Sequence, residues 1–518
     1  SMDCCSSGRV KLSLPEEEWL EGDTDKLCWH LVRWLCSLTM YTSTHAPDAN
    51  KVYQYLLPAT PLQEDLALLC RYYNSPYLTK IFLPTLIAKG KLHITSANMN
   101  QIVFYWKDAQ VDTSVIPIEY FKVEDIEDGF HFSFLPLLGR MANIKMLVIG
   151  CLVSDELLAV LGINCPHLQV FDARDDIGDM VSDVGLAYLA QCRGLKRVFF
   201  SAFANEYDLN VEKLGFTGRG VALLLTLPQI VQVTCSEYIL RDALHFLYRT
   251  RYHKQSLNVQ YMLMSDQEVR ASTLQILPIL CPKLRIVSMY LDTGCERTVG
   301  SSLKSLYNLE VLWITTASQC RFQDLSLSNY GPQLTFLGIT TCLLRTQDII
   351  LMSNCCPQLK ILVLRMYSYG FDCTNIDTIQ DSLFPSVEKL ELIQNISVTL
   401  FKILNVKMRN LRELHCARAH INNLEEAVVS ILEQGGWNNT ELLTLPMDYP
   451  ISLDVAQLVA SKSPSLKFMA VDLQSRQEKK LYRFLQNSVP GVKLLDYYPD
   501  LSPSKTGVFS DSVWLKRM

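Results

Sequence analysis

Apolar residues recur along most of this chain in a short pattern that returns about every 25 residues. The clearest copy is residues 356–364, Cys-Pro-Gln-Leu-Lys-Ile-Leu-Val-Leu, in which Leu359, Leu362 and Leu364 form an L-x-x-L-x-L series. We name each such series a rung, after its first apolar residue. Rungs begin at Ile144, Leu168, Leu195, Ile230, Leu257, Leu284, Leu309, Leu334, Leu359, Val387, Leu411, Leu442, Leu466 and Val492. Most steps are 24 to 28 residues.

Four rungs match the pattern least well: Ile230, Leu257, Leu442 and Val492. The rung at Leu257 has Gln260 where an apolar residue is expected. The steps of 35 residues into Ile230 and 31 residues into Leu442 predict insertions.

Each rung predicts a short strand with one apolar face. Side chains alternate along a strand, so Leu362 and Leu364 would face one side and Val363 the other. A six-residue strand cannot bury its apolar face alone, and equivalent strands laid side by side would build a parallel sheet with a continuous core. Residues 182–192 and 348–355, which lie between rungs, are apolar at helical spacing. The sequence therefore predicts an α/β solenoid of strand and helix repeats.

Proline marks the corner before many rungs, because it cannot continue a helix and favours an extended residue before it. The corners are Cys165-Pro166, Leu227-Pro228, Cys281-Pro282, Gly331-Pro332, Cys356-Pro357, Phe384-Pro385 and Ser463-Pro464. Three of them read Cys-Pro-x-Leu. With the repeat period, these corners resemble the cysteine-containing leucine-rich repeats of F-box and related ubiquitin-ligase substrate receptors. The resemblance covers roughly residues 140–500 and implies a horseshoe with a parallel concave sheet and convex helices.

The N-terminal residues have a different pattern. Helical spacing of apolar residues predicts helices near 23–40, 57–73 and 81–87, and Lys91–Thr95 predicts a first, imperfect strand. We expect a flexible leader at 1–22, a helical cap with the imperfect repeat at 23–140, the solenoid at 141–499, and a tail or cap at 500–518.

A helical block before leucine-rich repeats resembles the adaptor-binding receptors of cullin-RING ligases. Leu14-Pro15 could open an F-box, which binds a Skp-type adaptor, but Gly22 soon follows. The elongin-binding type has a Leu-x-x-x-Cys helix followed by an apolar-Pro pair, and the general shape here resembles Zyg-type receptors. That resemblance implies an adaptor-binding set of Leu27, Leu31, Leu35, Leu57 and Pro58, with leucine at position 31 where cysteine is usual. The same leucine stripe would also suit the packing face of a cap, and both interpretations stay open.

Composition narrows the class of protein. The chain is 49% hydrophobic and 19% charged, which is typical of a well-buried globular protein. Its net charge of −5, without a run of five Lys or Arg, argues against nucleic-acid binding. No run of about 18 apolar residues and no secretory signal occurs, so we expect no membrane span and a cytoplasmic or nuclear location. We expect the 17 cysteines to be reduced there.

Motifs for catalysis are absent from the sequence. There is no Cys-x-x-Cys, no His-Glu-x-x-His and no Gly-Lys-Ser/Thr phosphate loop, so we expect no metal, no cofactor and no enzymatic activity. An active site assembled by folding stays possible as an alternative.

The concave side of the predicted sheet carries the candidate binding residues. If the register of the rungs holds, the strands place aromatic side chains there, and beyond them a mixed-charge patch suited to a polar peptide. This partner-binding set is Phe199, Tyr290, Trp313, Phe336, Arg365, Lys389, Glu391, Glu413 and His415. A loop or the C-terminal tail that folds over these residues is the alternative. The sequence favours a non-enzymatic recognition module, with a ligase substrate receptor first and a scaffold or regulatory binder without a ubiquitin role second.

Overall fold

The computed structural model describes most of the chain from residue 119 onward and short segments before it. The described ranges are 3–4, 10–11, 91–95, 119–124, 135–149, 153–174, 180–200, 215–250, 256–292, 294–316, 322–372, 382–416, 418–446, 449–473 and 477–495. The chain divides into two compact units, unit 1 with residues 1–153 and 160–168, and unit 2 with residues 154–159 and 169–518.

Unit 1 contains a two-stranded sheet and three further strands. Strands β1 (Asp3–Cys4) and β2 (Val10–Lys11) are antiparallel, and β3 (Lys91–Thr95), β4 (Tyr120–Glu124) and β5 (Met146–Ile149) are parallel. The short helix α6 (Leu135–Leu138) precedes β5. The strand predicted at Lys91–Thr95 is confirmed. The predicted helices at 23–40, 57–73 and 81–87 and the tail at 500–518 lie outside the described residues.

Unit 2 is a parallel sheet in which, apart from the short β16, each strand pairs with the next one along the chain. Its strands are β6 (Val170–Ala173), β7 (Arg197–Phe200), β8 (Gln232–Thr234), β9 (Tyr261–Val269), β10 (Ile286–Leu291), β11 (Val311–Thr316), β12 (Phe336–Arg345), β13 (Ile361–Asp372), β14 (Lys389–Asn395), β15 (Glu413–His415), β16 (Ala419–His420), β17 (Leu442–Thr444), β18 (Phe468–Ala470) and β19 (Lys493–Leu494). The short strand β16 pairs with the end of β14, and β15 pairs with both β14 and β17.

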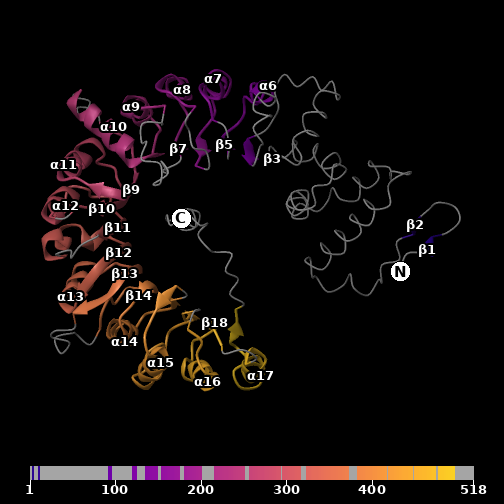
Figure 1. The fold of residues 1–518 in the computed structure, drawn as a ribbon, viewed down its shortest axis with the longest axis vertical. Helices are drawn as coiled ribbons and strands as arrows, with labels where there is room; N and C mark the ends of the chain where they lie inside the picture. Colours follow the sequence, from indigo (N-terminus) through magenta and orange to yellow (C-terminus); the bar gives the residue numbers. More distant parts are fainter. Residues whose placement is uncertain are drawn as a thin grey trace. The chain divides into compact units, whose positions relative to one another are not determined.

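Helices connect the strands of unit 2, and Figure 1 shows them on the outer side of its curved sheet. They are α8 (Asp183–Leu189), α9 (Gly218–Leu225), α10 (Glu237–Arg249), α11 (Ala271–Leu280), α12 (Glu296–Leu303), α13 (Thr346–Cys355), α14 (Val398–Lys407), α15 (Leu424–Glu433), α16 (Leu453–Lys462) and α17 (Glu478–Ser488). Three short 3-10 helices, η4 (Phe322–Leu325), η5 (Leu327–Asn329) and η6 (Gly331–Gln333), replace the helix between β11 and β12. Helix α7 (Asp155–Asn164) has residues in both units.

The predicted α/β solenoid of parallel strands is therefore the observed fold. Most strands begin two residues after the predicted start of a rung, as β13 does after Leu359. The three rung leucines Leu359, Leu362 and Leu364 are fully buried, as the alternation requires. They contribute to one core between the sheet and the helices.

Three of the weak rungs are misplaced in the predicted pattern. Pairing of Met262 with Val287, of Leu443 with Leu414 and of Leu494 with Met469 puts the true rung starts at Val259, Thr440 and Gly491. Thr440 can hold a core position because its hydroxyl donates to the Leu411 carbonyl at 3.2 Å. The sequence pattern missed two of these starts because threonine at position 440 and glycine at position 491 stand where leucine is usual.

Neighbouring repeats are tied together where their helices begin. The Asp155 carboxylate accepts the Ser182 N–H at 2.7 Å, and the Asp183 carboxylate accepts the N–H and the hydroxyl of Thr217, both at 2.7 Å. A β-carbon at Gly185 would lie 2.1 Å from Asp155 Oδ1. Glycine at that position therefore lets the carboxylate reach the N-cap of the next helix.

The Cys-Pro corners hold buried thiols. Cys165, Cys281 and Cys356 are all buried, and the Cys165 thiol lies 3.7 Å from the Met141 carbonyl. Burial raises the pKa of the Cys281 thiol to about 12 and that of the Cys356 thiol likewise to about 12. These three buried cysteines act as small apolar residues.

Candidate functional site

The candidate site is the side of the unit 2 sheet that faces away from the helices, which we call the concave face. Strand pairing sorts its residues into three rows that run across the strands. The first row contains Arg197, Gln232, Tyr261, Ile286, Val311, Phe336, Ile361, Lys389 and Glu413. The second row contains Leu263, Ser288, Trp313, Gly338, Val363, Glu391 and His415. The third contains Glu268, Tyr290, Thr315, Thr340, Arg365 and Ile393.

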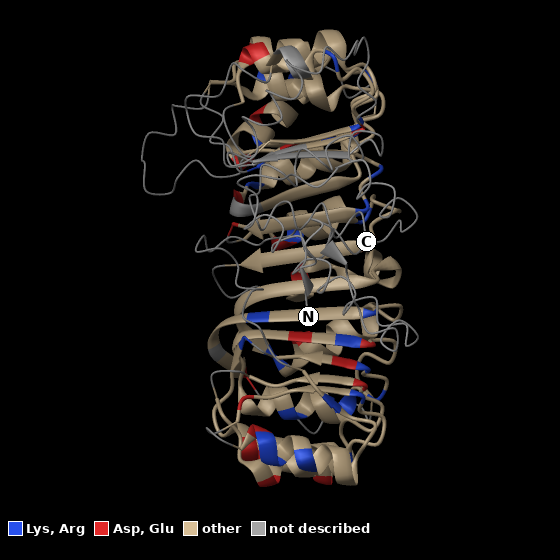
Figure 2. Cartoon of the chain, turned by 90° about the vertical axis from the view of Figure 1, so that its right-hand side faces the viewer, with Lys and Arg blue, Asp and Glu red and all other residues tan. Residues whose placement is uncertain are grey.

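The middle of the concave face is apolar and its C-terminal part is charged. On β10 to β13 the first row is Ile286, Val311, Phe336 and Ile361, and on β14 and β15 it becomes Lys389 and Glu413. Figure 2 shows this change, with blue and red on the strands of the lower half and mostly tan strands directly above them. An apolar centre with polar groups beside it is the usual anatomy of a protein-binding surface.

Trp313 lies flat across the centre of this face. Its ring stacks on Phe336 with centroids 5.8 Å apart, and its N–H donates to the Thr340 hydroxyl at 3.1 Å. Gly338 stands opposite Trp313 on the next strand, and a β-carbon there would lie 2.4 Å from the indole. Because glycine has no side chain, the half-buried indole can lie over the backbone of β12.

Three of the predicted aromatic residues lie close together, but they are not equally exposed. Tyr290, Trp313 and Phe336 lie on the neighbouring strands β10, β11 and β12, and each belongs to a different row. Phe336 is only 4% exposed, because the indole stacks over it. Trp313 and Tyr290 are half-buried and are the aromatic groups of this set that remain accessible.

Phe199 lies apart from this cluster. It is on β7, paired with Asp172 and Thr234, and the Arg174 guanidinium lies 4.8 Å above its ring. Asp172 accepts two hydrogen bonds from the Arg174 guanidinium, at 2.9 and 2.7 Å. Strands β8, β9 and β10 separate Phe199 from Trp313, so the fold does not bring the two rings together.

Three residues of the predicted mixed-charge patch form a connected group. The Lys389 ammonium lies 3.3 Å from a Glu413 carboxylate oxygen, and His415 Nε2 lies 3.3 Å from the same oxygen. Burial alone would raise the pKa of Glu413, but hydrogen bonds and charge from His415 and Lys389 outweigh it and lower this pKa. Glu413 is therefore ionised and paired with Lys389 and His415.

Glu391 has a different environment. It lies on β14, beside Val363 in the second row, with His415 on its other side. Burial raises the pKa of Glu391, and the nearby positive charges of Lys389 and Arg418 offset this only in part. Among the described residues, no hydrogen bond to its carboxylate is observed, although the side chain is half-buried.

Arg365, in the third row, completes the patch. Its guanidinium donates to Gln394 Oε1 at 3.1 Å and lies 6.0 Å from the centroid of the Tyr367 ring. Burial lowers the pKa of Arg365, and the charge of Arg418 adds to this effect. The arginine is thus held by neighbours on β13 and β14. Gln394 and Arg418 were not predicted, because both lie outside the L-x-x-L-x-L positions that the pattern marks.

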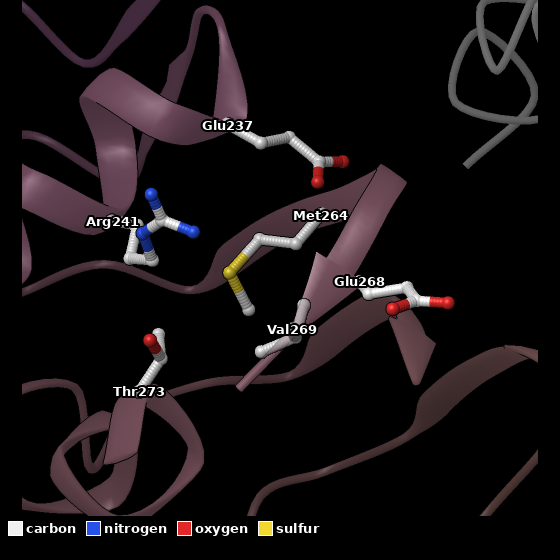
Figure 3. A pocket seen from close by; sticks show the side chains of 6 residues that line it. All are labelled: Glu237, Arg241, Met264, Glu268, Val269 and Thr273. Atoms are coloured by element: carbon white, nitrogen blue, oxygen red, sulfur yellow. The ribbon is translucent and has the colours of Figure 1, made fainter. Parts of the chain in front are cut away.

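A small pocket lies where α10, β9 and α11 meet (Figure 3). It is lined by Glu237, Arg241, Met264, Glu268, Val269 and Thr273. Its interior would hold about one water molecule, which is too small for a cofactor. Within the described parts of the chain, no group of three or more His, Cys, Asp or Glu is placed to hold a metal ion. No helix of these same residues is long and apolar enough to cross a membrane.

The adaptor-binding residues predicted from the resemblance lie outside the described residues. Leu27, Leu31, Leu35, Leu57 and Pro58 all belong to the N-terminal stretch for which the structure gives no placement. Their adaptor role stays a prediction.

Comparison with known proteins adds little to this site. No protein-family model matches the chain, and no curated protein matches it. Among solved structures, a chain of the yeast Rad7 and Elc1 complex is similar, with 14% identity and a TM-score of 0.41 over 95% of this chain and 100% of that chain. At this identity and TM-score, the likeness identifies neither a function nor a partner.

Proposed function

We propose that this chain is a non-enzymatic protein-recognition module, and that it serves as the substrate receptor of a cullin-RING ubiquitin ligase in the cytoplasm or nucleus. The concave face would hold the substrate. The N-terminal residues 23–75 would hold an elongin-type or Skp-type adaptor and, through it, a cullin.

The observation that carries the recognition role is the apolar centre of the concave face. Trp313 is held in one orientation by Phe336, Gly338 and Thr340 before any partner binds. A rigid, half-buried tryptophan beside charged groups offers large contact area with little entropy to lose on binding, as interface hot spots do.

The ligase role rests on the sequence. Cys-Pro corners and a leucine-rich helix before a Leu57-Pro58 pair resemble the receptors of this class. A scaffold or regulatory binder without a ubiquitin role shares the same concave face, because this fold supports many binding tasks. An enzyme with a site assembled by folding is the third alternative.

The test is purification of the tagged full chain from cells, followed by detection of cullins and of both adaptor types. The variants are the double substitution Leu27→Ser with Leu31→Ser, Trp313→Ala, and Tyr307→Ala as the control. Tyr307 is an 80% exposed aromatic residue in the turn between α12 and β11, away from the concave face.

We expect the leucine double variant to lose the adaptor and cullin while it keeps other partners, and Trp313→Ala to show the reverse. Tyr307→Ala should behave as wild type. If no cullin or adaptor is recovered with the wild-type chain, the scaffold alternative replaces the ligase role. If every partner survives Trp313→Ala, the concave face is not the recognition surface.

A further inference from the structure

We propose that the concave face recognises a protein segment that places a lysine or arginine side chain on Glu391 and a bulky apolar side chain against Trp313. This inference rests on the proposed recognition function and adds the chemistry of the partner.

The two halves of the proposed site lie in one row. Moving across the strands, the second row passes from the Trp313 indole over Gly338 to Val363 and then to Glu391. Two strand spacings separate Gly338 from Glu391, or about 10 Å. An extended segment rises about 3.3 Å per residue, so its apolar and basic residues would stand about three positions apart.

Two positively charged residues of the patch, Lys389 and Arg365, already have partners other than Glu391. Lys389 pairs with Glu413 at 3.3 Å, and Arg365 donates to Gln394 at 3.1 Å. His415 beside Glu391 is directed to Glu413, with its Nε2 at 3.3 Å from the carboxylate. Glu413 has two partners, whereas the Glu391 carboxylate receives no hydrogen bond from the described residues and is affected only by the charges of Lys389 and Arg418. An incoming basic group can therefore bind to it.

Holding this half-buried carboxylate without a hydrogen bond from the described residues costs free energy in the unbound protein, in line with the raised pKa of Glu391. A partner's ammonium or guanidinium would offset that cost with charge-assisted hydrogen bonds. An acidic segment would meet the opposite situation, because Lys389 and Arg365 would have to leave their present partners. Charge complementarity therefore favours a partner segment that carries a basic residue as well as the apolar residue that contacts Trp313.

The test uses the full chain and, as the probe, a displayed library of random 12-residue peptides. Selection is repeated with Glu391→Gln, Glu391→Lys, Trp313→Ala and the matched control Glu388→Gln. Glu388 is a nearby glutamate whose carboxylate already pairs with Lys360 at 2.9 Å. Circular dichroism and hydrogen exchange verify that each variant is folded.

We expect wild-type selections to enrich Lys or Arg about three positions from an aromatic or aliphatic residue. Glu391→Gln should weaken the best peptide by about tenfold or more, Glu391→Lys should shift enrichment to Asp or Glu, and Glu388→Gln should change neither. Peptides that depend on Trp313 but show no basic preference would overturn this inference and leave the recognition function standing. If the wild-type chain enriches no peptides, or if the selected peptides depend on neither Glu391 nor Trp313, the result would count against this inference and against the recognition function.

One further outcome separates a partner from the chain itself. Residues 514–517, Trp-Leu-Lys-Arg, carry the same chemistry within this sequence. If the full chain selects such peptides only after these four residues are changed to alanine, the natural occupant is its own C-terminal segment, and the proposal of a separate partner is wrong. Equal selection with and without that change supports a separate partner.

Discussion

Adding one methyl group at Gly338 should displace Trp313 from the sheet. The β-carbon of Gly338→Ala would lie 2.4 Å from the indole, far inside normal contact distance, and the neighbouring indole atoms follow at 2.5 and 3.0 Å. The ring cannot tilt away without breaking its stack on Phe336 and its hydrogen bond to Thr340. The substitution therefore acts mainly through Trp313.

The expected magnitude follows from this aromatic stack and this hydrogen bond, which the displaced indole no longer makes. An aromatic stack is worth about 0.5–1.5 kcal/mol beyond its buried area, and a typical hydrogen bond contributes about 1 kcal/mol net. Gly338→Ala should therefore lower local stability by about 2 kcal/mol. In a Trp313→Ala background the methyl group meets no indole, and the same change should be neutral or stabilising by up to about 1 kcal/mol, since alanine is favoured over glycine within a strand.

Hydrogen exchange of the amides in β11 and β12 measures this locally, which suits a solenoid whose repeats open in part independently. We expect exchange about 30-fold faster in Gly338→Ala than in wild type, the equivalent of 2 kcal/mol. A double-mutant cycle with Trp313→Ala should give a coupling free energy of about 2 kcal/mol. Additive effects of the two substitutions would refute the contact between the indole and Gly338.

Other regions allow separate tests. Gly185→Ala should destabilise the repeats around α8 by about 1–3 kcal/mol, because its β-carbon would collide with the Asp155 carboxylate. The control Gly491→Ala, where a β-carbon meets nothing within 4 Å, should leave stability unchanged. Equal urea midpoints for the two variants would contradict this prediction. The Cys281 thiol, with a pKa of about 12 against an ordinary 9.0, should react with iodoacetamide about a thousandfold more slowly in the folded than in the unfolded protein. A carboxyl whose pKa is raised on folding destabilises the folded state above that pKa. Because the pKa of Glu391 is raised, Glu391→Gln should slow hydrogen exchange in β14 at pH 7. This gain in stability should vanish below the ordinary pKa of 4.5. Slower exchange that persists at low pH would show another cause.

The repeat period and the strand register could be predicted from the sequence because the leucines at rung positions must all be buried on one side. Leu312 and Ile314 are fully buried and Trp313 between them faces away from the helices, as alternation alone requires. Misplaced rungs occurred where threonine or glycine took the position of leucine, as at Thr440 and Gly491.

Contacts between the rows could not be predicted in the same way. The indole of Trp313 lies toward β12 because Gly338 has no side chain, and this buries Phe336, which the pattern alone would leave exposed. A glycine within an otherwise apolar strand was the available signal, since it often marks the close approach of another group. The lack of a hydrogen bond to Glu391 depends on which partners its neighbours take: Lys389 pairs with Glu413 across strands, and His415 contacts Glu413 within β15. The linear sequence does not specify these choices.

The most direct test of the central claim, that the concave face binds a protein partner, is the affinity of Trp313→Ala for the partner that the wild-type chain captures. Titration calorimetry on variants verified as folded, with Tyr307→Ala as the control, gives the comparison. We expect binding weaker by about tenfold or more for Trp313→Ala, since truncating such an anchor costs about 2 kcal/mol, and unchanged binding for Tyr307→Ala. Equal affinity of the folded Trp313→Ala variant and the wild type would contradict the assignment of this face as the recognition surface.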